Sequence, residues 1–236
     1  MIAVGCLEGN VEMRDSSANL FKPGRRVPFY ENTPDNLHCF QAVLRMILKY
    51  FEPEEEFSWE NLEEISQRRP NGYTWGTAAM LWLHRRGYEI RDVGLFDSKK
   101  FTEIGAPYMI EFHGETAGRD QIANSDIDHE VRLAKEALVE IGQSPLSIPT
   151  LETFRQFKRE GFLTFTLVNS AALINQPGYC GHFVLILDAD HEWVKIHNPG
   201  LPGYENQRVR ISTFEKAWAH STEKSKNLTA VRHTKA

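Results

Sequence analysis

The sequence predicts an α+β protein in which a mainly helical part precedes an antiparallel sheet. Between residues 37 and 157, apolar residues recur mostly at the spacing of amphipathic helices. From residue 162 onward, short apolar runs separated by polar turns have the pattern of strands. Helices followed by strands, rather than alternating with them, are typical of the α+β class.

The central element is a helix that we expect between Leu37 and Phe51. Pro34 and Asn36 provide a turn and an N-cap before it, and neither Gly nor Pro interrupts it until Pro53. Apolar side chains cover most of its circumference, and its polar residues form one narrow stripe. Such a helix is buried in the middle of a domain rather than laid on its surface.

Cys39 falls in the first turn of this helix if Asn36 is the N-cap. There, unpaired N–H groups and the positive end of the helix dipole favour a thiolate over a thiol, so Cys39 is a candidate nucleophile. Most free cysteines are nevertheless small buried apolar residues, and one cysteine beside a helix cap does not define a site. The other polar residues of the chain decide between these interpretations.

The remaining elements follow from cap, spacing and turn signals. The later helices are expected to begin at caps on Ser58, Thr74, Ser125 and Thr150 and to end near Pro70, Gly87, Gly142 and Gly161, respectively. The expected strands are 88–93, 108–112, 162–168, 181–187, 193–197, 208–211 and 228–232, with a helix at 212–219. Residues 113–130 are polar and poor in large apolar side chains, which predicts a long surface loop or lid.

We expect a single domain over residues 1–236, because no repeat, low-complexity tract or linker marks a boundary. In this interpretation residues 1–27 are an N-terminal extension, and residues 113–145 are a polar loop followed by a helical insertion. A cleft between the helical part and the sheet is the natural place for a site. Trp75 and Cys180 are candidates for its walls, although both also fit ordinary packing positions.

Composition narrows the function classes. A net charge of -5 with scattered Lys and Arg gives no basic stripe for nucleic acid. The apolar runs are too short to cross a bilayer and the N-terminus lacks the features of a signal peptide, so we expect a cytoplasmic protein with no membrane partner. Cys6, Cys39 and Cys180 are odd in number and widely spaced, which indicates neither a disulfide framework nor a zinc ribbon. We expect no metal or cofactor, and nothing in the sequence indicates the oligomeric state.

A second group of polar residues lies in a predicted hairpin that is closed by a polar turn at 188–192. With this turn His182 faces Asn198, and opposed residues have Cβ atoms about 5 Å apart. In the same register Leu187 faces Trp193. An Asn or Asp beside a histidine orients the imidazole so that its other nitrogen can act on a nucleophile.

These residues together resemble the papain-like cysteine peptidase superfamily, and within it the stand-alone relatives of the bacterial double-glycine leader peptidases. The resemblance covers the chain from Pro28 to Trp218. It is carried by Leu37 to Phe51, by Tyr73-Thr74-Trp75, by Gly178-Tyr179-Cys180-Gly181-His182-Phe183-Val184, by His197-Asn198-Pro199-Gly200 and by Phe214-Glu215-Lys216-Ala217-Trp218.

The resemblance implies a papain-like fold with a triad. Cys39 would be the nucleophile, His182 the general base and then the general acid, and Asn198 the residue that orients the histidine, where relatives usually carry Asp. Phe40 stands where many relatives have Gly after the cysteine.

The largest departure from the family concerns the oxyanion hole. In the family a Gln about six residues before the cysteine completes this hole, whereas this chain has Thr33 there. Asn32 or Asn36 is the candidate replacement, helped by the Cys39 backbone N–H. The loss of one oxyanion donor typically costs about a hundred- to a thousand-fold in rate.

We therefore expect a cysteine peptidase or amidase that hydrolyses a peptide or small amide substrate through a thioacyl intermediate. One alternative is a thiol acyltransferase on the same scaffold, which passes the acyl group to an amine instead of water. Another is a catalytically inactive peptide-binding protein, which the missing Gln favours. Residues 113–130 are where we expect substrate gating.

Overall fold

The computed structural model describes residues 25–70, 72–220 and 222–234. Within these residues the strands form one six-stranded antiparallel sheet in the order β1-β6-β2-β3-β4-β5. The strands are β1 Tyr88–Gly94, β2 Leu163–Asn169, β3 Gly181–Ala189, β4 Trp193–Asn198, β5 Tyr204–Arg210 and β6 Asn227–His233. The predicted α+β class is confirmed.

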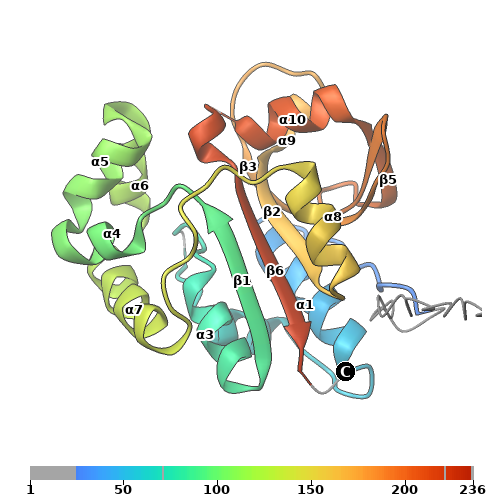
Figure 1. The fold of residues 1–236 in the computed structure, drawn as a ribbon, viewed down its shortest axis with the longest axis horizontal. Coiled ribbons are helices and arrows are strands. Elements are labelled where there is room, and N and C mark those ends of the chain that lie inside the picture. The colour runs from blue at the N-terminus through green and yellow to red at the C-terminus, as the bar shows by residue number, and fades with distance from the viewer. Residues whose placement is uncertain (1–24, 71, 221, 235–236) are drawn as a thin grey trace, which may run out of the picture.

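Helices cover both faces of the sheet and extend beyond its β1 edge (Figure 1). They are α1 Cys39–Phe51, α2 Trp59–Ser66, α3 Thr77–Arg85, α4 Ser98–Ile104, α5 Ala106–His113, α6 Glu115–Asn124, α7 Ile127–Glu140, α8 Leu151–Arg159, α9 Ser170–Leu173 and α10 Ile211–Ala219, with a short 3-10 helix η1 at Glu223–Ser225. In the part of the chain that the structure describes, no helix is both long and apolar enough to cross a membrane.

Strand alternation divides the core into two layers. On β3, Val184 and Ile186 point into a cluster that α8 and α10 cover, whereas Leu185 points into a second cluster that α1, α2 and α3 cover. In Figure 1, α8 and α10 lie in front of the sheet and α1 and α3 behind it. The predicted burial of the central helix is confirmed, because nine of the residues of α1 are buried.

Helices α4 to α7 form a lobe at the β1 side of the sheet (Figure 1). The lobe has its own small core, built around Phe101, Tyr108, Met109, Ile127 and Ala134. Leu133 of α7 connects the lobe to α3, where it packs with Ala78 and Leu81.

Two predictions fail in this lobe. The expected strand at 108–112 lies within α5, and the expected loop at 113–130 contains α6 and the start of α7. The polar residues of α6 face solvent, so its sequence lacks the apolar stripe of a core helix. Gly118 permits its close approach to α5, since a Cβ there would lie 2.6 Å from the Cα of Ile110.

Several predicted helix starts are displaced. The N-cap of α1 is His38, because Asn36 adopts a left-handed conformation with φ 60. The N-cap of α3 is Gly76 rather than Thr74. The N-cap of α7 is Asp126, whose side chain accepts from the His129 N–H. The predicted caps of α2 at Ser58 and of α8 at Thr150 are confirmed, and both form capping boxes.

The predicted N-terminal extension at 1–27 lies mostly outside the described residues. Its last part continues into a segment that follows the end of β4. The carbonyl of Val27 lies 3.1 Å from His197 Nε2, and the ring of Phe29 lies against the His197 ring with centroids 5.3 Å apart. This segment leads directly to the start of α1.

Candidate active site

Cys39 is the first residue of α1 and is half-buried. Backbone N–H groups of Phe183 on β3 and of Phe40 in the first helical turn lie close enough to its sulphur to lower the pKa of the thiol. The first-turn N–H groups have no partner within the helix, which is why they are available to the sulphur. The predicted position of Cys39 in the first turn is therefore confirmed.

The charge state of Cys39 differs from the sequence-based expectation. Burial raises the pKa of the Cys39 thiol above its ordinary value, and the hydrogen bonds from Phe183 and Phe40 oppose this shift without reversing it. The nearby Cys180 raises the pKa of Cys39 further. In the ligand-free protein the thiol form is thus favoured, because burial outweighs the helix N-terminus.

His182 and Asn198 are brought together as the sequence predicts. His182 is the second residue of β3 and Asn198 the last of β4, and His182 Nε2 lies 2.7 Å from Asn198 Oδ1. Both residues are buried. Burial lowers the pKa of His182, against the effect of its bond to Asn198, so the ring is neutral near pH 7.

The network around Asn198 fixes the histidine tautomer. Asn198 Nδ2 donates to Gln207 Oε1 at 2.8 Å, so Asn198 Oδ1 is the atom that faces the ring. The same oxygen accepts from the Gly200 N–H at 3.1 Å. Because this oxygen only accepts, His182 Nε2 carries the proton. Nδ1 is then the basic nitrogen, and it has no protein partner among the described residues.

The predicted hairpin register is wrong, although the pair of side chains is right. Leu185 pairs with His197 and Ala189 with Val194, and the register shifts between Ile186 and Asp188. The turn is shorter than expected, since β3 extends to Ala189, and a β-bulge absorbs the difference.

The turn of this hairpin has a structural explanation. Asp190 Oδ1 accepts from the N–H groups of Glu192 and Trp193, each at 2.7 Å. Asp188 Oδ1 lies 2.6 Å from Lys158 Nζ. Among the described residues, no group of three or more His, Cys, Asp and Glu side chains is arranged to hold a metal ion.

His182 lies one residue before the contact between β3 and the start of α1. Phe183, whose N–H contacts the sulphur, directly follows His182 in β3. The rings of Phe40 and Phe183 meet edge to face with centroids 5.0 Å apart, which holds the start of α1 against β3. Because neighbouring side chains of a strand point to opposite faces, the imidazole of His182 and the ring of Phe183 leave β3 on opposite sides.

The two proposed cleft residues differ in their placement. Cys180 is exposed and lies close enough to Cys39 to affect its pKa. Trp75 belongs to the core of the lobe: its ring stacks on Phe101, and its Nε1 donates to Ser125 Oγ at 3.0 Å. Its described contacts give it no part in the surroundings of Cys39.

Asn32 organises the turn before α1. It is buried, and its N–H donates to the Pro199 carbonyl at 2.8 Å, next to Asn198 in the chain. Asn32 Oδ1 accepts from the His38 N–H at 2.7 Å and from the Thr33 N–H at 2.9 Å. One Asn32 Nδ2 hydrogen goes to Asn36 Oδ1 at 2.9 Å. Asn36 itself is exposed, and its side chain serves Asn32.

Sequence reasoning missed a second histidine network beside Cys39. His38 is buried, with Nε2 2.6 Å from Glu63 Oε1 and Nδ1 2.5 Å from Thr33 Oγ1. Arg68 Nη1 donates to the same Glu63 oxygen at 2.9 Å. Hydrogen bonds from Thr33 and from the Leu37 N–H lower the pKa of the neighbouring Asp35 to about 2. The only sequence signal was the position of His38 directly before the cysteine.

No protein-family model and no curated protein matches this chain.

Proposed function

We propose that this protein is a papain-like cysteine hydrolase that cleaves a peptide or amide bond with Cys39 as nucleophile. The observation that carries the proposal is the buried His182–Asn198 hydrogen bond of 2.7 Å, held one residue from the backbone group that contacts the Cys39 sulphur. Covalent acyl transfer requires a nucleophile, a base and an orienting residue that meet, and in this proposal Cys39, His182 and Asn198 have these roles.

The reaction begins from a neutral pair. Burial raises the pKa of Cys39 and lowers that of His182, which disfavours a resting thiolate–imidazolium pair. As the sulphur attacks the carbonyl carbon, His182 Nδ1 takes the thiol proton. The imidazolium then passes this proton to the leaving amine as the C–N bond breaks, which leaves a thioester on Cys39.

Hydrolysis of the thioester repeats the sequence with water. His182 takes a proton from the water, the hydroxyl adds to the acyl carbon, and the C–S bond breaks as the proton returns to the sulphur. Asn198 holds the same ring orientation throughout, because its oxygen accepts from Nε2 in both steps. The products are a carboxylic acid and the free enzyme.

In this proposal, the oxyanion is stabilised by the Cys39 backbone N–H and by Asn32. The amide of Asn32 has two N–H hydrogens, and the bond to Asn36 uses one of them. Support for Asn32 comes from its burial and from its backbone bond to Pro199, which ties it to the loop that follows Asn198.

Covalent trapping tests the proposal. The full chain is treated with a panel of peptidyl acyloxymethyl ketones, and the labelled residue is mapped by mass spectrometry. We expect labelling at Cys39 in the wild type and in Cys180→Ser, and none in Cys39→Ser. Preferential labelling of the exposed Cys180, or no labelling of Cys39 by any peptide, would contradict the proposal.

A thioester substrate distinguishes the acyl acceptor. With a peptidyl thioester and an added primary amine, a hydrolase gives mainly the acid, whereas an acyltransferase gives mainly the amide. A protein that binds the peptide without turnover would favour the inactive alternative over both.

A further inference from the structure

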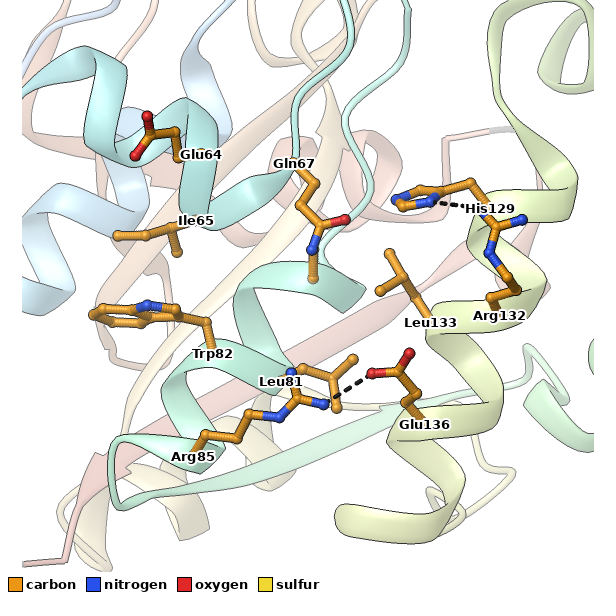
Figure 2. A pocket seen from close by; sticks show the side chains of 11 residues that line it. Glu64, Ile65, Gln67, Leu81, Trp82, Arg85, His129, Arg132, Leu133 and Glu136 are labelled. Carbon is orange, nitrogen blue, oxygen red and sulfur yellow. Dashed lines mark hydrogen bonds and ion pairs between the residues drawn. The ribbon is translucent and has the colours of Figure 1, made fainter.

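A cavity of about 290 Å³ lies between α2, α3 and α7, on a part of the molecule separate from the candidate active site (Figure 2). Its lining residues come from these three helices and from Gln67, the C-cap of α2, and none of them belongs to the proposed triad or to the turn before α1. Its volume is at the lower end of the range for small-molecule sites. The cavity joins the lobe to the helices that cover the sheet.

One wall of the cavity is apolar. Leu81 of α3 and Leu133 of α7 are buried and meet at its base, and the half-buried Trp82 adds an aromatic face. Figure 2 shows the side chains of Leu81, Leu133 and Trp82 around the open space. Such a surface favours an apolar group, because its burial removes apolar area from water.

Hydrogen-bond donors line the opposite side. Arg132 Nη2 donates to His129 Nδ1 at 3.1 Å. Because a guanidinium has no acceptor, His129 Nδ1 must accept, which places the ring proton on Nε2 and makes Nε2 a donor. Figure 2 shows the His129 ring and the Gln67 amide extending into the space between α2 and α7. Within the described residues, the Gln67 side chain has no protein partner.

The charged side chains of the cavity differ in whether they form ion pairs. Glu136 pairs with Arg85 at 2.8 Å, although Arg85 also pairs with Glu140 at 2.6 Å, and the carboxylate of Glu64 points away from the open space in Figure 2. Arg132 makes no ion pair with a carboxylate of the described chain; besides His129 it contacts only the Asp128 carbonyl, at 3.4 Å. A guanidinium without an ion-pair partner among the described residues therefore lines the same space as two neutral donors.

We propose that this cavity binds a small carboxylate with an apolar body. The carboxylate lies on Arg132, with His129 Nε2 and the Gln67 amide as further donors, and the body lies against Leu81, Leu133 and Trp82. Charge-assisted bonds from a guanidinium suit a carboxylate because two parallel N–H groups match its two oxygens. The ligand connects α7 of the lobe to α2, the helix that also carries Glu63, the partner of His38.

Two sources present this chemistry: a free aryl-alkyl acid, and the C-terminus of a peptide that ends in an apolar residue. Isothermal titration calorimetry on the full chain separates them, with phenylbutyrate for the first and N-acetyl-glycyl-phenylalanine for the second. The C-terminal amide of the same dipeptide is the control for the carboxylate. We expect saturable binding of at least one acid. The affinity for the amide should be lower than the affinity for the acid by about tenfold or more.

The variant Arg132→Gln tests the site itself. Arg132 is exposed, so its replacement leaves the fold intact, and we expect affinity for the bound acid to fall by about tenfold or more. Arg119→Gln, a change at an exposed arginine on α6 that pairs with Glu115, is the matched control and should bind as the wild type does. Cys39→Ser should also bind normally, which separates this proposal from the proposed catalysis.

Three results would overturn the proposal. Absence of saturable binding of either acid, equal affinity for the acid and the amide, or unchanged affinity in Arg132→Gln would each exclude a carboxylate site in this cavity.

Discussion

Two buried histidines, His38 and His182, differ in the partners of their ring nitrogens. His182 has one partner, the Asn198 amide, and keeps Nδ1 without a protein partner among the described residues. His38 has polar partners on both ring nitrogens, Glu63 on one side and Thr33 on the other. A ring with both nitrogens occupied cannot take a proton from a thiol without breaking a bond. In the proposed mechanism, this free nitrogen, rather than closeness in sequence to Cys39, is the reason why His182 is the base.

The largest effect is expected when the two histidines are exchanged for glutamine one at a time. His182→Gln removes the base and should slow labelling of Cys39 by the acyloxymethyl ketone by about a hundred-fold or more. His38→Gln keeps a side chain that can donate to Glu63 and should retain most of the rate. Mass-spectrometric labelling rates measure both, and equal losses in the two variants would remove the distinction between them.

A smaller effect is expected at the orienting residue. Asn198→Ala removes the hydrogen bond that raises the pKa of His182, so that pKa should fall further, and the labelling rate should drop by about tenfold. Proton NMR of the imidazole gives the first quantity. Asn198→Asp restores the acceptor, with Gln207 turning its amide to donate, and should recover most of the rate. If the labelling rate of Asn198→Asp does not exceed that of Asn198→Ala, then Asn198 acts only through packing.

At Glu63, the partner of His38, the change Glu63→Gln should lower the stability of the fold more than it slows the labelling reaction. The change removes a charge that His38 and Arg68 share, which lowers the melting temperature. The labelling rate and its pH profile should stay close to those of the wild type, because His182 is untouched. Scanning calorimetry and the labelling assay check the two parts, and a displaced pH profile would assign His38 a role in proton transfer.

The smallest effect concerns the thiol in the absence of substrate. Burial raises the pKa of Cys39, which leaves less thiolate at any given pH. Alkylation by iodoacetamide should therefore reach half of its maximal rate at a higher pH than for free cysteine, and peptide mapping separates Cys39 from Cys180. A midpoint below that of free cysteine would mean that the helix N-terminus and His182 outweigh burial.

Residue types and spacing were sufficient to predict part of the candidate site, because a helix start and two strand ends have local signals. Cys39 was placed in the first turn of a buried helix, and His182 was paired with Asn198. The register was not predictable, since a bulge near Leu187 depends on how β3 packs rather than on its own pattern.

The polar contacts around the candidate site could not be predicted from the sequence, for a different reason. Asn32 reaches the His38 N–H across a turn, and His38 reaches Glu63 on another helix, so neither contact follows from local periodicity. The lobe was misread because α6 is polar on most of its surface and because Gly118, usually a helix breaker, is needed for its contact with α5. The cavity between α2 and α7 likewise exists only once the lobe has folded against α3.

The proposed mechanism requires that His182 presents an unprotonated Nδ1 to Cys39 while Asn198 holds Nε2–H. Nitrogen-15 NMR of the ring nitrogens, assigned with the His182→Gln variant, tests it most directly. The account predicts a neutral ring at pH 7 with the proton on Nε2, and a shift of that signal in Asn198→Ala. A proton on Nδ1, or an imidazolium at that pH in the ligand-free protein, would contradict it.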